Sequence, residues 1–125
     1  MSDDFMPLKE HGVLEFVEGE FELFPNLHLV LMNGHTAAQQ LPKITDGRNT
    51  LLYCCDLFPT VSHIPLPYIM AYDLRPLTTL EEKKKILKSA VDEEWTLFFE
   101  HDPSTAAGKV RSNGKGYEFS EPVEV

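Results

Sequence analysis

Hydrophobic residues fall into short runs, and each of these runs ends at a polar residue. Apolar and polar positions alternate from Leu27 to Met32, whereas Thr50 to Cys55 and Trp95 to Phe99 are apolar at almost every position. Alternation is typical of a half-buried strand, and a continuous apolar run indicates a strand that is buried on both faces. We therefore expect strands over 27–32, 50–55 and 95–99 at the centre of a sheet.

Two hairpins are expected at the ends of the chain. Near the N-terminus, strands over 13–17 and 21–24 would be joined through Glu18-Gly19-Glu20, with Pro25-Asn26 turning the chain into the next strand. Near the C-terminus, strands over 108–111 and 116–119 would flank Asn113-Gly114, a dipeptide that favours tight turns.

Two segments are expected to be loops. The first, 36–49, contains Pro42 and Asp46-Gly47. The second, 57–76, contains four prolines, at positions 59, 65, 67 and 76, and so favours irregular structure. Long loops beside candidate ligands are often functional.

The pattern from Thr79 to Val91 predicts a helix. Thr79 and Glu82 have the spacing of a capping box, in which each side chain bonds a free backbone N–H of the first turn. An apolar stripe would face the sheet, while Lys83-Lys84-Lys85 is expected to lie mostly in solvent. The helix would end at Asp92-Glu93-Glu94. The stripe consists of Leu80, Ile86, Leu87, Ala90 and Val91.

These elements predict one α/β domain of the α+β type over residues 1–125, with a mixed, mainly antiparallel sheet and a helix on one face. The 125 residues are 42% hydrophobic, enough to bury a core. A net charge of −9 argues against nucleic acid or an anionic membrane as a partner. No apolar run reaches the roughly 18 residues of a membrane span, and the acidic N-terminus is unlike a signal peptide, so we expect a cytoplasmic protein.

A histidine, an aspartate and a histidine follow the three central strands. His35 comes after the first, Asp56 after the second and His101 after the third. Side chains at neighbouring strand ends can converge, and two imidazoles with one carboxylate suit zinc, iron or manganese. Taken singly, a histidine at a strand end is more often a hydrogen-bonded structural residue. Cys54 and Cys55 should point to opposite faces of their strand and form no disulfide with each other.

The order of these motifs resembles the C-terminal half of a metallo-β-lactamase-superfamily hydrolase, from about residue 7 to residue 119. That resemblance implies half of an αββα sandwich. It also implies that His35 serves a first metal, that Asp56 bridges two metals and that His101 serves the second. The matching motifs are Gly34-His35-Thr36, Asp56, Pro67-Tyr68-Ile69-Met70-Ala71-Tyr72-Asp73 and Phe99-Glu100-His101-Asp102-Pro103.

The chain departs from that family in three places. The upstream His-x-His-x-Asp-His motif, which supplies about half the ligands in the family, does not occur in it. Ala37-Ala38 stands where the family usually has Pro-Gly, and Cys55 stands where it usually has Gly. Proline and glycine fix backbone angles that alanine does not, so the turn after His35 is in question. A cysteine before Asp56 is expected to crowd a metal pocket.

Two functions remain open from the sequence. The first is a truncated, catalytically incomplete domain with a residual metal site at His35, Asp56 and His101, holding one ion at most per chain, most readily zinc. The alternative is a metal-dependent hydrolase of ester, lactone or amide bonds, with Asp56 as the catalytic residue. That enzyme would be active as a dimer or with a separately encoded N-terminal half.

Two further residues are candidates at the same rim. His63 could orient a ligand or contact a substrate, although packing within its loop is the simpler interpretation. Asp73 is likewise a candidate to orient a ligand or contact a substrate, although capping a turn is the simpler interpretation. A chain equal to half a sandwich would also leave one apolar sheet face open, so we expect a homodimer through that face or a separate N-terminal half that covers it.

Overall fold

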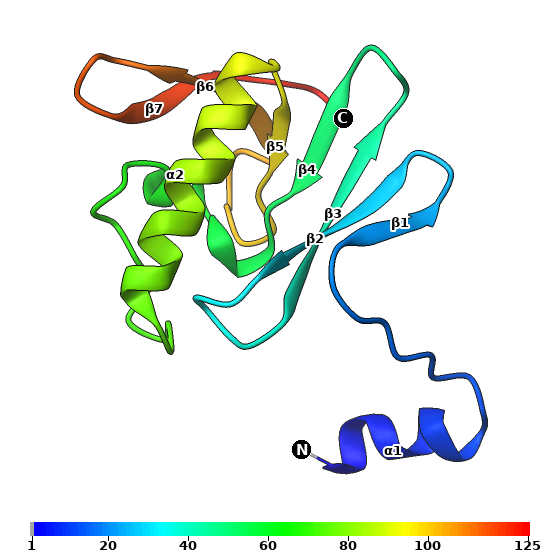
Figure 1. The fold of residues 1–125 in the computed structure, drawn as a ribbon. Helices are drawn as coiled ribbons and strands as arrows, with labels where there is room; N and C mark the ends of the chain where they lie inside the picture. The colour runs from blue at the N-terminus through cyan, green and yellow to red at the C-terminus, as the bar shows by residue number, and fades with distance from the viewer. Residues whose placement is uncertain (1) are drawn as a thin grey trace.

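Seven strands form one sheet in the computed structural model, which describes residues 2–125 (Figure 1). The strands follow one another across the sheet in chain order, and all neighbours are antiparallel except β4 and β5, which are parallel. The expected mixed, mainly antiparallel sheet is thus confirmed. The strands are β1 (Phe21–Phe24), β2 (Leu27–Met32), β3 (Gln39–Thr45), β4 (Thr50–Tyr53), β5 (Thr96–Phe98), β6 (Ala107–Ser112) and β7 (Tyr117–Pro122).

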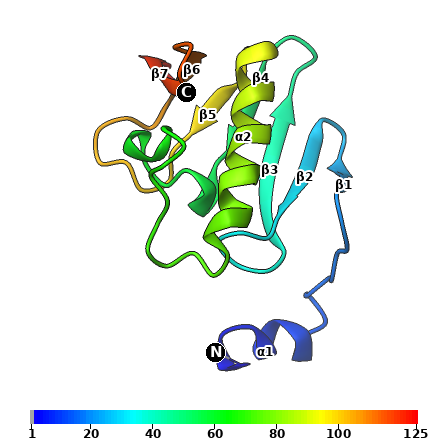
Figure 2. The same cartoon turned by 60° about the vertical axis from the view of Figure 1, so that its left-hand side comes forward.

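Helix α2 (Pro76–Asp92) connects the parallel pair and covers one face of the sheet (Figures 1 and 2). Its buried residues Ile86, Leu87 and Ala90 belong to the same core cluster as Leu52 of β4 and Leu97 of β5. Burial of each large aliphatic side chain in this cluster stabilises the folded chain by roughly 1.5–3 kcal/mol. No helix of the described chain, residues 2–125, is long and apolar enough to cross a membrane.

The opposite face of the sheet is apolar and open. Leu51, Tyr53 and Phe98 are only partly buried, and Ile44 is 46% exposed. The rings of Tyr53 and Phe98 stack with their centroids 5.3 Å apart. From Leu51 to Cys54 half-buried and buried residues alternate, because α2 covers one face only.

The region expected to be the loop 36–49 contains strand β3, so that expectation is wrong. β3 pairs with β2 from Gln39 to Ile44, and Pro42 lies opposite Leu29. Pro42 lacks an N–H group, but the pairing of β3 with β4 covers only Lys43 to Thr45 and leaves Pro42 just outside that ladder. The apolar signal of β3 is weak because polar residues surround Leu41 and Ile44.

The expected hairpin over 13–17 and 21–24 is also wrong. Residues 13–18 form no regular element, and β1 pairs instead with β2 through the turn at Pro25-Asn26. Asn26 has a left-handed backbone with φ of 71°, which asparagine tolerates better than most residues. Helix α1 (Ser2–Glu10) lies apart from the sheet in both views (Figures 1 and 2). The expected C-terminal hairpin is confirmed as β6 and β7.

Helix α2 begins earlier than the sequence predicts, and its buried stripe includes Ile86, Leu87 and Ala90 as expected, whereas Leu80 and Val91 are only partly buried. Pro76 is its first residue and Arg75 its N-cap, so Thr79 lies inside the helix and forms no capping box with Glu82. The buried residues are Thr79, Lys83, Ile86, Leu87 and Ala90. Lys84 and Lys85 are exposed as expected, whereas the expectation for Lys83 is wrong because its side chain is fully buried.

Lys83 of α2 holds the long loop between β4 and α2 against the helix. Its Nζ donates hydrogen bonds to backbone carbonyl oxygens of that loop and lies 5.6 Å from the centroid of the Phe58 ring. Burial lowers the pKa of Lys83 to about 8, while Asp73 acts in the opposite direction. The four acceptors are His63, Pro65, Leu66 and Tyr68, at 2.6, 3.0, 3.4 and 2.8 Å.

Candidate functional site

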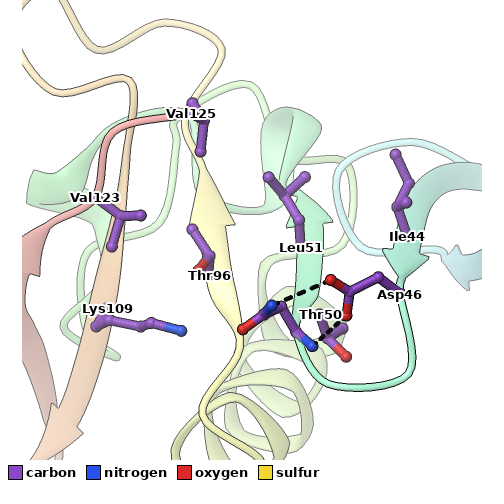
Figure 3. A pocket seen from close by; sticks show the side chains of 9 residues that line it. Ile44, Asp46, Thr50, Leu51, Thr96, Lys109, Val123 and Val125 are labelled. Atoms are coloured by element: carbon purple, nitrogen blue, oxygen red, sulfur yellow. Dashed lines mark hydrogen bonds between the residues drawn. The ribbon is translucent and has the colours of Figure 1, made fainter.

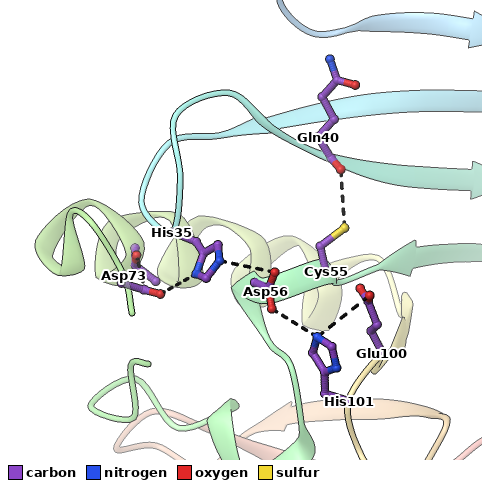
Figure 4. A network of polar contacts seen from close by, with 8 residues as sticks. His35, Gln40, Cys55, Asp56, Asp73, Glu100 and His101 are labelled. Carbon is purple, nitrogen blue, oxygen red and sulfur yellow. Dashed lines mark hydrogen bonds and ion pairs between the residues drawn. The ribbon is translucent and has the colours of Figure 1, made fainter. Parts of the chain in front are cut away.

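The carboxyl ends of β2, β4 and β5 lie at one edge of the sheet. β2 and β4 both run antiparallel to β3, and β5 is parallel to β4, so these three strands share one direction. The residues that follow them therefore meet at a common rim, which is where His35, Asp56 and His101 are found (Figure 4). Asp56 lies in the short 3₁₀ helix η1 (Cys55–Leu57).

Asp56 lies between the two histidines. His35 Nε2 is 3.4 Å from Asp56 Oδ2, and His101 Nε2 is 3.4 Å from Asp56 Oδ1 (Figure 4). The two imidazoles thus contact different oxygens of one carboxylate. The His35 side chain is mostly buried, whereas that of His101 is 54% exposed.

Asp73 supports His35 from the side away from Asp56. Its Oδ1 lies 2.9 Å from His35 Nδ1, and its side chain is only 1% exposed. Asp73 Oδ2 accepts a hydrogen bond of 2.6 Å from the Thr79 hydroxyl group. The structure therefore brings Asp73 together with the three expected ligands, and Thr79 is an addition that the sequence pattern did not indicate.

His63 takes part in a different set of contacts. It lies in the 3₁₀ helix η2 (Val61–His63), and its Nδ1 is 2.8 Å from Thr60 Oγ1. Burial lowers the pKa of His63, and the Lys83 charge lowers it further, with Asp73 opposing both. These contacts point to packing within the loop and do not reach Asp56.

Asp102 joins the His101 turn to the η2 loop. Its carboxylate accepts backbone N–H groups from Val61, Ser104 and Thr105, at 3.0, 3.0 and 2.9 Å. Burial acts to raise the pKa of Asp102, but these hydrogen bonds lower it overall. The His101 N–H also donates to the Pro59 carbonyl at 3.0 Å, so two loops fix the position of His101.

The donor types suit zinc, but the described side chains do not form a complete metal site. Two imidazoles and a carboxylate are common zinc ligands. Among the side chains that the structure describes, those of residues 5–125, no three His, Cys, Asp or Glu are arranged so that they could hold one ion. Cys55 adds no ready thiolate, because burial, with Glu100 and Asp56 nearby, raises its pKa to about 11. Cys54 is buried in the core, and both cysteines are free.

The two positions where glycine was expected have backbones that favour glycine. Ala38 has φ of 59° and Cys55 has φ of 45°, both in the left-handed region. The turn after His35 still forms, because the Ala38 N–H donates to Asn33 Oδ1 at 3.0 Å. The Cys55 side chain points toward β3, where its Sγ lies 3.5 Å from the Gln40 carbonyl oxygen (Figure 4).

Replacing Ala38 by glycine should stabilise the protein by about 0.5–1 kcal/mol. Glycine removes the steric cost of the left-handed backbone, and this gain exceeds its larger loss of entropy on folding. Urea unfolding followed by circular dichroism measures the change. Ala37 is the matched control, because its φ is not positive and glycine there should destabilise by a similar amount. If Ala38→Gly and Ala37→Gly changed the free energy of unfolding equally, the backbone of Ala38 would not be strained.

The fold is similar to that of several solved metal-dependent hydrolases. A probable metal-dependent hydrolase from Staphylococcus aureus matches 91% of this chain with a TM-score of 0.77 and 23% identity. AidC, a dizinc quorum-quenching lactonase, matches 92% with a TM-score of 0.78 and 23% identity. The hydrolase AbOPH of the β-lactamase superfamily matches 99% with a TM-score of 0.84 and 15% identity. No family model and no curated protein matches the sequence.

The matched region is a part of each of these proteins. The chain covers 42% of the Staphylococcus aureus hydrolase, 40% of AidC and 43% of AbOPH. It therefore spans about two fifths of the length of the solved structures that it matches. The fold of this chain is thus similar to part of the fold of these hydrolases, as the order of its motifs predicts.

Proposed function

We propose that this chain is the part of a metal-dependent hydrolase fold that presents His35, Asp56 and His101 to a divalent metal, zinc above all, and that it is catalytically incomplete alone. The contact pattern at Asp56 carries this proposal. Each carboxylate oxygen has one imidazole beside it, at 3.4 Å in both cases. An ion at either oxygen would thus find one nitrogen and one oxygen ligand here, and would need further ligands from another segment or from water.

The alternative is a working hydrolase formed when a second segment completes the site. AidC is described as a dizinc lactonase, and another similar structure is an N-acyl homoserine lactone hydrolase with its product at a catalytic metal centre. By analogy, the bond attacked would be an ester, lactone or amide. A complementing segment from elsewhere in the same polypeptide, from a separate chain or from a second copy could provide the remaining ligands.

Zinc binding tests the proposed ligand set. The chelator-treated chain is titrated with zinc in a calorimeter, and elemental analysis of the untreated protein measures its zinc, iron and manganese. Asp56→Ala should weaken zinc binding at least tenfold, because among the described side chains Asp56 alone offers a carboxylate to both imidazoles. Asp92→Ala, at the exposed end of α2, is the control. The proposal fails if the wild-type chain takes up no zinc or if both variants bind it equally.

Hydrolysis assays separate the two functions. The chain alone, with zinc present, should show negligible turnover of homoserine lactones and simple esters, because the bound ion would lack part of its ligands. Zinc-dependent turnover that Asp56→Ala removes would instead establish the alternative.

We also propose that the open face of the sheet is where a second copy of this chain binds. The face has an apolar hollow of about 510 Å³ lined by Pro42, Ile44, Leu51, Tyr53, Phe98 and Val125. A second hollow, seen with α2 behind the sheet in Figure 3, continues from it through Ile44, Leu51 and Val125 toward Thr96 and Lys109. A dimer that covers this surface would bury more than about 1,200 Å² and restore a four-layer arrangement.

Sedimentation velocity at micromolar concentration tests this assembly. The wild-type chain should sediment as a dimer, and Ile44→Asp should shift it to a monomer because a charge cannot be buried at an apolar interface. Leu77→Asp is the matched control, since Leu77 is 78% exposed and belongs to α2, on the other side of the sheet. A monomeric wild-type chain would contradict the dimer and favour a complementing segment as the cover.

A further inference from the structure

Hydrogen bonds join the loop that carries His35 to helix α2 and to the turn before it. The N–H groups of Asn33 and Gly34 donate to the two carboxylate oxygens of Glu82, at 2.7 and 3.0 Å. In return, the Arg75 N–H donates to the Gly34 carbonyl at 2.9 Å and Arg75 Nη1 donates to the Asn33 carbonyl, also at 2.9 Å. These bonds orient the backbone from which the His35 side chain projects.

The His35 ring is fixed by a second set of contacts from the same region. A carboxylate can only accept hydrogen bonds, so the 2.9 Å contact with Asp73 Oδ1 requires a proton on His35 Nδ1. The Thr79 hydroxyl donates to the other oxygen of Asp73 at 2.6 Å and thereby fixes the carboxylate plane. With Nδ1 as the donor, His35 Nε2 is directed at Asp56 Oδ2, 3.4 Å away.

We infer that Asp73, Thr79 and Glu82 are positioning residues, through which helix α2 sets the ring orientation and the tautomer of His35. The inference rests on the proposed function for its purpose, because an imidazole protonated at Nδ1 presents the lone pair of Nε2 to a ligand. Thr79 and Glu82 have the spacing of a capping box, but neither caps α2, whose N-cap is Arg75. Glu82 bonds to the His35 loop instead, and Thr79 bonds to Asp73.

The three residues act at two levels. Glu82 holds the backbone of the loop, and Asp73 with Thr79 holds the ring. Thr79 is 1% exposed and contacts neither His35 nor Asp56 in the bonds described, so its effect on the ring passes through Asp73. A role in packing alone would be preserved by valine, which has the same shape as threonine but lacks the hydroxyl group. The hydroxyl group and the shape of Thr79 can therefore be separated.

Nitrogen and proton NMR of the His35 ring in the chelator-treated chain tests the inference. Wild type and Thr79→Ser should show a proton on Nδ1, protected from exchange with water. Thr79→Val should speed that exchange by about fivefold or more, the effect of losing one hydrogen bond of roughly 1 kcal/mol. Asp73→Ala should move the proton to Nε2, because Asp56 Oδ2 is then the remaining carboxylate acceptor near the ring.

The inference is overturned if the Nδ1 proton is unchanged in both Asp73→Ala and Thr79→Val. If Asp73→Ala does not fold, the comparison of Thr79→Ser with Thr79→Val decides alone. Glu82→Gln, which keeps one carbonyl acceptor for two N–H groups, should broaden the backbone signals of Asn33 and Gly34. The NMR experiment is done without metal, so it can be judged separately from the zinc titration. A His35 tautomer that depends on Asp73 and Thr79 in a chain that binds no zinc would contradict the proposed function only. Zinc binding by a chain whose His35 tautomer does not change in these variants would contradict this inference only.

Discussion

Replacement of Lys83 by methionine is expected to lower the free energy of unfolding by about 3–5 kcal/mol. Methionine fills a similar volume but leaves the part-buried backbone carbonyls of the 63–68 loop without the Lys83 donor, and a desolvated carbonyl without a partner is costly. Urea unfolding followed by Trp95 fluorescence measures the loss. Lys84→Met is the matched control, because Lys84 is exposed and pairs only with Glu81 at the surface. If Lys83→Met lowered the free energy of unfolding by less than about 1 kcal/mol, the hydrogen bonds of Lys83 to the loop would not be important for stability.

The same lysine predicts how stability depends on pH. Its pKa is lowered to about 8 in the folded chain, from an ordinary value of 10.5. Between these two values the unfolded chain binds more protons than the folded chain, so stability should rise with pH across this window. The gain in wild type relative to Lys83→Met should approach about 3 kcal/mol by pH 10.5. Parallel stability curves for the two proteins would show that the pKa of Lys83 is not lowered.

Gly34→Ala should destabilise the protein by about 2–4 kcal/mol and release the His35 loop from α2. A methyl group at position 34 would lie 2.2 Å from Thr79 Oγ1, 2.5 Å from Thr79 N and 2.6 Å from Thr79 Cα. Two of these are helix backbone atoms, so the loop or the helix must move. Thermal unfolding reports the destabilisation, and the exchange rate of the His35 Nδ1 proton reports the release.

Gly116→Ala is the control for this substitution. Gly116 has no positive φ, and no other atom lies near the position that a methyl group would take. Its replacement should change the free energy of unfolding by less than about 0.5 kcal/mol. If Gly34→Ala were equally mild and left the His35 ring signal unchanged, close contact between the loop and α2 would be disproved.

Hydrophobic periodicity identified the strands that carry the rim but not every element. β2, β4 and β5 have clear apolar runs, and the Asn113-Gly114 turn marks β6 and β7. β3 has no such run, because its pairing with β2 and β4 rather than its own composition makes it a strand. Residues 13–17 have the strand pattern but form no strand, and β1, their expected partner, pairs with β2 instead.

The candidate site was predictable where it depends on strand order, and unpredictable where it depends on tertiary contacts. Strand ends bring His35, Asp56 and His101 to one rim, and this follows from the order of the motifs. The roles of Thr79, Glu82 and Lys83 do not follow, because local spacing suggests a cap and a solvated run for these residues. Their side chains bond to loops far away along the chain, and no pattern within one helix reports those bonds.

The spacing of these bonds along the chain bears on the order in which the molecule assembles. Lys83 reaches carbonyls that are 15 to 20 residues away, whereas Glu82 reaches Asn33 and Gly34 across 49 and 48 residues. Closing the longer span costs about 1 kcal/mol more in chain entropy. We therefore expect the loop around Lys83 to fold onto α2 early, and the His35 loop to dock late and to be among the first parts to open by local unfolding.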